Sequence, residues 1–125
     1  MLTLPPTVRI FVCLEPTDMR KGFDGLSAAT RELIGEDPLS GHLFVFFNRR
    51  RDRVKALLWD RSGLCIWYKR IERGRFQLAA LDAYRGGRHA EIEAAELMLI
   101  LEGITLTNAK RRPRFIPRQS ACVSA

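Results

Sequence analysis

The residues best suited to a chemical task in this sequence are arginines, and many of them lie in two short clusters. The first cluster surrounds an aspartate and contains Arg49, Arg50, Arg51, Arg53 and Lys55. The second follows further along the chain and contains Lys69, Arg70, Arg73 and Arg75. An arginine side chain presents a planar fork of donors that matches the oxygen atoms of a phosphate group. The clusters therefore predict contact with phosphates, such as those of a nucleic-acid backbone.

The distribution of charge along the chain supports the same interpretation. The 125 residues include 21 basic and 14 acidic ones, with a net charge of +7. Residues 48–75 alone carry ten basic and three acidic residues, whereas residues 1–47 and 76–109 are both net acidic. Clustered positive charge is typical of proteins that bind nucleic acids. The alternative is a basic surface that serves only solubility.

A third basic stretch lies near the C-terminus and contains Lys110, Arg111, Arg112 and Arg114. The composition changes here from mixed to basic and small residues, which is typical of a segment without a packed core. We therefore expect one α+β domain over residues 1–107 and a disordered basic tail over residues 108–125.

Aromatic residues near the clusters leave two roles open. Trp59, Trp67 and Tyr68 are close enough in sequence to the arginines to stack on unpaired bases. Packing in the core of a sheet is the alternative role for such side chains.

The sequence offers no recognisable catalytic arrangement. Metal-dependent phosphoryl transfer needs two or three converging carboxylates. The available ones include Asp18, Asp24, Asp52, Asp60 and Glu72, but charge pairing or a turn position accounts for Asp52 and Asp60. A phosphate-binding glycine loop, a nucleophile elbow and a Cys/His pair are not found either. We predict a protein that is not an enzyme and has no metal or other cofactor, with a metal-dependent nuclease as the least favoured alternative.

The cysteines predict an intracellular setting. Cys13, Cys65 and Cys122 are odd in number and lack the Cys-x-x-Cys spacing of zinc sites, so we expect buried free thiols. His42 and His89 stand alone. A long apolar run and a secretory leader are not found, which predicts a cytoplasmic protein without membrane contact.

The elements that must position the arginines form a predicted antiparallel meander. Residues 42–47, 54–59 and 64–69 read as strands, with hairpin chemistry at residues 60–63. In a meander, the connection before the second strand and the end of the third lie at the same end of the sheet. The two basic clusters should therefore converge. Residues 8–14 add a further strand, which makes about four.

Two main helices are expected to pack against this sheet. The first has Thr17 as its N-cap, apolar side chains at helical spacing through residue 33, and a stop at Gly35. The second spans residues 90–102 and has an acidic start. Residues 79–84 could form a further short helix.

A mixed-charge run early in the first helix suits contact with a partner protein. It contains two glycines three residues apart, which would let one helix face approach another backbone closely. The candidate partner-binding residues are Asp18, Arg20, Lys21, Gly22 and Gly25.

Several runs of residues carry a resemblance to a known family. They are DMRKGFDGL at 18–26, PLSGHLFVFFNRRRDRVK at 38–55, LWD at 58–60, Gly63 and YKRIERGRF at 68–76. Together they resemble the TnpB (Orf2-like) accessory proteins of the insertion sequence 66 family of bacterial transposable elements. The similarity runs from about residue 8 to residue 76, with a weaker echo at 96–104, and the basic tail lies outside it.

The resemblance implies a role in transposition beside a separate transposase and a second accessory protein of the same element. It carries no assigned catalytic residues. One hypothesis is an accessory factor that binds DNA near the transposon ends through the basic clusters, with the tail adding non-specific affinity. The alternative is an adaptor that docks on the transposase through the run at 18–26 and does not bind DNA.

Overall fold

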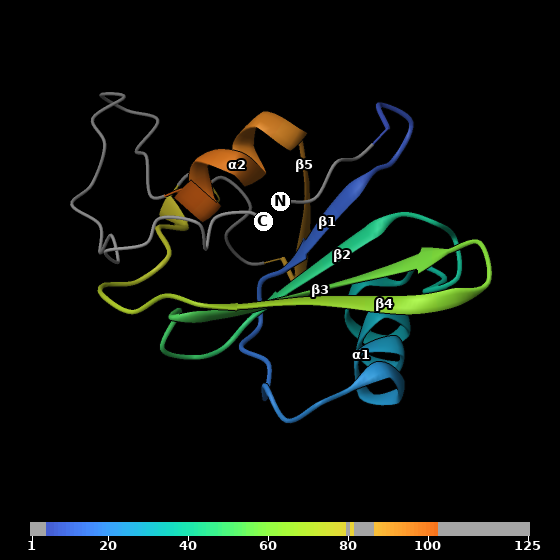
Figure 1. The fold of residues 1–125 in the computed structure, drawn as a ribbon, viewed down its shortest axis with the longest axis horizontal. Helices are drawn as coiled ribbons and strands as arrows, with labels where there is room; N and C mark the ends of the chain where they lie inside the picture. Colours follow the sequence, from blue (N-terminus) through green and yellow to red (C-terminus); the bar gives the residue numbers. More distant parts are fainter. Residues whose placement is uncertain (1–4, 80, 82–86, 103–125) are drawn as a thin grey trace, which may run out of the picture.

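The computed structural model describes residues 5–79, 81 and 87–102, which form a mixed β-sheet with a helix on each face (Figure 1). The strands are β1 (Ile10–Cys13), β2 (Leu43–Phe47), β3 (Arg53–Asp60), β4 (Gly63–Arg70) and β5 (His89–Ile92). The helices are α1 (Phe23–Ala29), which continues into a π-helical turn η1 (Thr30–Ile34), and α2 (Ala94–Glu102). The order across the sheet is β4-β3-β2-β1-β5. The predicted α+β class is confirmed.

The meander of β2, β3 and β4 is confirmed as antiparallel, with Val45 opposite Ala56 and Leu57 opposite Ile66. β1 pairs with β2 in parallel. A parallel pair needs a crossover connection, which α1 and η1 supply. All five residues of β2 are buried, as expected of a central strand that is covered on both faces.

Two apolar clusters fill the two sides of the sheet. Phe11, Phe44, Phe46 and Leu57 face α1, and Leu26 of that helix packs among them. On the other side, Val12, Val45 and Val54 belong to the cluster that includes Leu97 and Ile100 of α2. Residues that alternate along one strand therefore contribute to different clusters, because successive side chains point to opposite faces.

The prediction for residues 90–102 was wrong at its start. His89–Ile92 is a strand that pairs antiparallel with β1, placing Ile92 opposite Ile10 and Ala90 opposite Val12. Ala90 and Ile92 are buried, whereas His89 and Glu91 are exposed, so the local period is that of a strand. The helix begins at Ala94, and the Glu96 carboxylate accepts a hydrogen bond from the Glu93 main-chain N–H at 3.0 Å, as in a capping box.

The first helix also begins later than predicted. Thr17 is not its N-cap, because the N-cap position is occupied by Gly22. The Thr17 main-chain N–H instead donates to the Phe47 carbonyl at 2.9 Å. Asp18 instead closes a turn by accepting the Arg20 N–H at 2.9 Å, a local bond that competes with helix formation. The helix starts at Phe23 after Gly22 and ends at Gly35, whose φ of 78° is the expected left-handed stop.

The expected thiol burial is confirmed for Cys13, and this burial raises the pKa of its thiol. It was wrong for Cys65, which is exposed on β4. Cys122, the short helix proposed at 79–84 (apart from residues 79 and 81) and the whole tail at 108–125 lie outside the described residues. No described helix has the length and apolar character that crossing a membrane requires.

Phe44 lies at the centre of the sheet with none of its side chain exposed. We expect Phe44→Ala to lower the free energy of unfolding by about 3–5 kcal/mol, because it removes a buried ring and leaves a cavity. The measurement is equilibrium unfolding in urea. The matched control is Phe23→Ala, since Phe23 is 50% exposed and should lose about 1 kcal/mol or less. Equal losses for the two variants would contradict the assigned core.

Candidate nucleic-acid interface

The connection between β2 and β3 is a compact loop that Asn48 holds closed. The Asn48 Oδ1 atom accepts hydrogen bonds from the main-chain N–H groups of Asp52 and Arg53, both at 3.1 Å. Its Nδ2 atom donates to the Asp52 carboxylate at 2.7 Å. One side chain therefore satisfies three polar groups of the loop. The loop, residues 48–52, is called the arginine tip below.

Arg51 occupies the turn position of this tip, where its φ of 59° lies in the left-handed region. Asp52 is the acidic residue of the tip. The hydrogen bond from Asn48 lowers the pKa of Asp52, and the charges of Arg50 and Arg53 act in the same direction. Asp52 is therefore ionised at neutral pH and is engaged by the tip itself.

The second basic cluster lies against the tip, as the sequence predicted. The main-chain N–H of Ile71 donates to the Asp52 carbonyl at 2.9 Å, and that of Phe76 donates to the Arg51 carbonyl at 2.7 Å. Phe76 is buried, and its ring lies 5.4 Å from the Phe47 ring. Residues 71–76 are thus tied to the arginine tip by main-chain bonds and anchored in the core.

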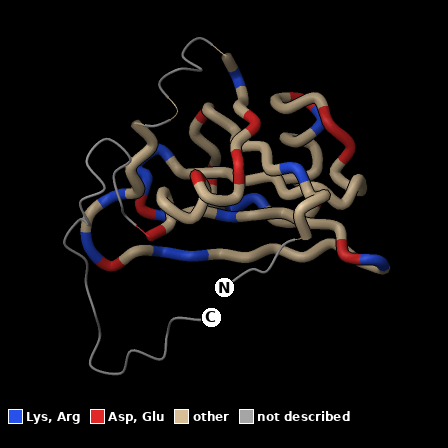
Figure 2. Tube along the Cα trace, turned by 90° about the horizontal axis from the view of Figure 1, so that it is seen from above, with Lys and Arg blue, Asp and Glu red and all other residues tan. Residues whose placement is uncertain are grey.

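These contacts gather basic side chains at one end of the sheet, where Figure 2 shows Lys and Arg segments close together. Within the described part of the chain, Arg70 forms an ion pair with Glu72 at 3.3 Å, whereas Arg49, Arg50, Arg51, Arg53 and Arg73 form none. The side chains at 49–51 and 73 are exposed. Unpaired arginines at such density favour an anionic ligand.

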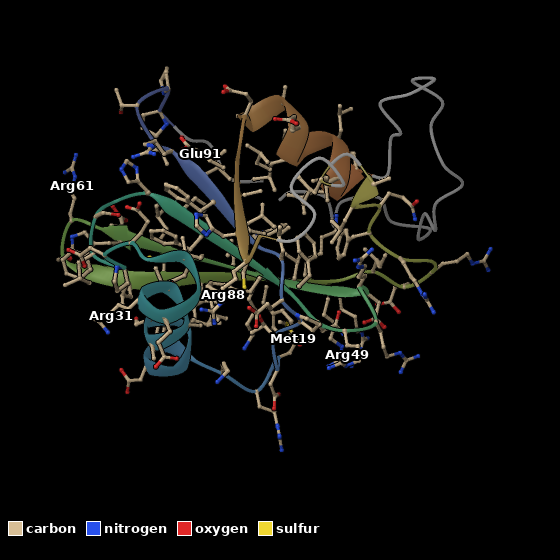
Figure 3. The ribbon with its side chains drawn as sticks, turned by 180° about the vertical axis from the view of Figure 1, so that it is seen from behind. Met19, Arg31, Arg49, Arg61, Arg88 and Glu91 are labelled. Atoms are coloured by element: carbon tan, nitrogen blue, oxygen red, sulfur yellow. The ribbon has the colours of Figure 1, made fainter. Side chains whose placement is uncertain are left out.

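Residues 18–26, called the Asp18 run below, begin at the same end of the sheet as the arginine tip. No signal in the sequence indicated this proximity. An open cleft of about 570 Å³ lies between residues 16–19 and the arginine tip. Its lining is Pro16, Thr17, Asp18, Met19, Asn48, Arg49, Arg50 and Arg53. Figure 3 shows Met19 and Arg49 near each other, although they come from segments far apart in the sequence. The bond from Thr17 to the Phe47 carbonyl fixes the two walls.

Asp18 and Arg20 form a tight pair beside this cleft. The Arg20 Nη2 atom lies 2.7 Å from Asp18 Oδ2, and Arg20 Nε lies 3.0 Å from the same oxygen. This side-chain bond, together with the Arg20 main-chain bond, lowers the pKa of Asp18 to about 2. The Arg20 side chain remains 91% exposed. Asp18 is therefore a structural anion rather than a free general base.

The two glycines of the run have different explanations. A Cβ atom at Gly25 would lie 3.0 Å from the Lys21 side chain, so a larger residue there would require that side chain to shift. A side chain at Gly22 would meet nothing within 4 Å. The close approach of another backbone, which the sequence suggested for this face, is not found among the described residues.

Lys55 links the Asp18 run to the sheet. Its Nζ atom donates to the Lys21 carbonyl at 2.8 Å and lies 4.8 Å from the centroid of the Tyr68 ring. Trp59 and Trp67 are half-buried, and Trp67 packs against the core on the α2 side. The basic tail residues Lys110, Arg111, Arg112 and Arg114 lie outside the described residues. Over the ranges that the structure describes, no group of three or more His, Cys, Asp or Glu side chains could hold a metal ion.

Comparison with known proteins shows which family of proteins this chain is similar to. A family model described as IS66 Orf2 like protein matches residues 8–111. Two uncharacterized proteins of Sinorhizobium fredii strain NGR234 are similar. The protein y4jC is 35% identical over 91% of this chain and 94% of its own length, and y4hO is 38% identical over 83% and 87%. No solved structure matches the chain significantly.

Asn48→Ala tests whether the tip is built as described. We expect it to lower the free energy of unfolding by about 1–3 kcal/mol, because three hydrogen bonds are lost and two main-chain N–H groups lose their partner. Urea unfolding measures the loss. Ser62→Ala in the opposite hairpin is the control and should change stability by about 0.5 kcal/mol or less. An Asn48 variant as stable as the parent would contradict the closed tip.

The Asp18–Arg20 pair predicts an unusual titration. Because the native pKa of Asp18 is lowered to about 2 from an ordinary 3.8, the pair is fully formed above pH 3.8 and is lost as the pH falls through about 2. An NMR titration of the Asp18 carboxyl carbon measures this midpoint. Arg20→Ala should move it up toward 3.8, whereas Arg31→Ala should not. A parent midpoint near the ordinary value would contradict the pair.

Proposed function

The chain belongs to the family of IS66 Orf2-like proteins, and we propose that it is a non-catalytic accessory protein that supports transposition by binding DNA. The observation that carries the DNA-binding part is the convergence of two arginine clusters on one end of the sheet. The main-chain bonds from residues 71 and 76 to the arginine tip produce that convergence. Family membership supports the association with an insertion sequence.

Phosphates of the DNA backbone are the ligands that this surface suits best. Its arginines are exposed except for Arg53, which is half-buried, and five of them form no ion pair within the described residues. Contacts of this kind release condensed counterions and therefore depend steeply on salt. The binding residues that we propose are Arg49, Arg50, Arg51, Arg53, Lys55, Lys69, Arg70, Arg73 and Arg75. The tail residues Lys110, Arg111, Arg112 and Arg114 would add affinity without sequence preference.

The carboxylates near this surface support a binding role over a nuclease. Asp52 accepts a hydrogen bond from Asn48, and Glu72 pairs with Arg70. Both are thus occupied by the groups that shape the basic surface. We propose that the protein positions DNA in the cytoplasm, where the transposase of the element carries out the chemical steps.

A second candidate function is docking on the transposase or on the other accessory protein of the element. Arg20 is almost fully exposed, Gly22 has open space around it and Phe23 is half exposed. Folding therefore leaves much of the Asp18 run available to a partner. Because this run shares a cleft with the arginine tip, a protein partner and DNA could be held side by side.

Fluorescence anisotropy on a labelled duplex, titrated with salt, tests the proposal. At least five phosphate contacts should give a slope of log affinity against log salt steeper than about −4. The double variant Arg49→Gln/Arg50→Gln should flatten this slope by about 2, because each arginine accounts for roughly one phosphate. A transposon-end duplex and a scrambled one, compared side by side, report any sequence preference.

The matched control is Arg31→Gln/Arg61→Gln, which removes the same charge. Figure 3 shows Arg31 and Arg61 at the other end of the sheet from Arg49. This variant should leave the slope within about 0.5 of the parent, since its arginines lie away from the proposed contacts. Equal slopes for the two variants would show that net charge alone drives binding. No binding even at low salt would remove the DNA role and leave docking on the transposase.

A further inference from the structure

Tyr68 is an exposed aromatic side chain that lies beside basic side chains of β3. It lies on β4, the last strand on its side of the sheet, and it is 47% exposed. Its cross-strand partner is Lys55, and the adjacent pair on the same face is Arg53 opposite Arg70. An aromatic ring thus stands among three basic side chains.

Two of these side chains hold the ring in place. The Lys55 Nζ atom lies over one face of the ring, 4.8 Å from its centroid, and is itself fixed by the bond to the Lys21 carbonyl. The Arg53 Nη1 atom donates to the Tyr68 hydroxyl at 3.4 Å. One face is therefore covered by a cation, and nearly half of the side chain is left to receive a planar group. A ring whose position is already fixed loses little conformational freedom when it binds.

Arg53 and Arg70 supply anion-binding groups beside this ring. Like charges directly opposite each other on neighbouring strands destabilise a sheet, so an anion placed between them would relieve the repulsion. The ion pair of Arg70 with Glu72 does not prevent this, because both side chains are more than half exposed and such pairs contribute little.

We infer that this end of the sheet binds unpaired DNA, with a nucleobase stacked on Tyr68 and its flanking phosphates bound by Arg53 and Arg70. The inference rests on the proposed function and adds the form of DNA that is preferred. In a duplex both faces of each base are covered by neighbouring bases. A single exposed ring at a sheet edge can therefore stack only on a base that is single-stranded, frayed or flipped out.

The test compares a labelled single strand of about 15 thymidines with a duplex of the same length, near the site sizes of other single-strand binders. Anisotropy at one fixed salt concentration measures both affinities. The parent protein should bind the single strand more tightly than the duplex. Tyr68→Leu keeps apolar bulk but removes the aromatic face, and it should weaken single-strand binding by about 5- to 150-fold. Tyr68→Phe keeps the ring and should retain the preference.

Duplex binding and its salt slope should not change in the Tyr68 variants, since the phosphate-binding arginines remain. Leu39→Ala is the control for loss of an exposed apolar side chain, because Leu39 is also 47% exposed and lies before β2, away from the tip. A parent protein that binds the single strand no better than the duplex would overturn the inference. So would equal single-strand affinity of the parent and Tyr68→Leu, even if the arginine-dependent duplex binding persists. If the parent protein bound neither the single strand nor the duplex, the proposed function would be overturned together with this inference.

Discussion

Two main-chain hydrogen bonds tie the segment after β4 to the arginine tip, and the arrangement of the charged end depends on them. Ile71 and Phe76 donate to the carbonyls of Asp52 and Arg51, while burial of the Phe76 ring against Phe47 holds the segment down. These contacts oppose the mutual repulsion of the basic clusters. Without an apolar anchor of this kind, exposed arginines of like charge would separate. The fold thus concentrates positive charge by means of uncharged interactions.

The arginine tip is also held together by groups other than its arginine side chains. The neutral amide of Asn48 satisfies two main-chain donors and the Asp52 carboxylate, so the arginines are not needed to close the loop. They remain available to a ligand. The Asp18–Arg20 turn is likewise self-contained, because its ion pair is internal. Both walls of the cleft are therefore organised before anything binds there, which lowers the entropic cost of binding.

The structure also relates the two functional hypotheses to each other. The proposed DNA binding and the proposed docking on the transposase would draw on different residues, namely the arginine clusters and the Asp18 run. Asp18 and Met19 line one cleft together with arginines of the first cluster. The bond from Lys55 to the Lys21 carbonyl also connects the two regions. A partner that contacts the Asp18 run would lie next to any DNA held by the tip. This proximity suits an accessory protein that brings an enzyme and its DNA substrate together.

The sequence by itself determined the meander of β2, β3 and β4 and the convergence of the arginine clusters, because strand alternation and short turns are local and dictate which ends meet. The resemblance of its motifs also identified the family. Only the tertiary structure decided that His89–Ile92 is a strand, since its acidic residues favour a helix start until Ala90 and Ile92 pack beside β1. The same holds for the hydrogen bond from Thr17 to Phe47 and for the exposure of Tyr68. Each depends on partners distant in the chain, and local patterns carry no information about such contacts.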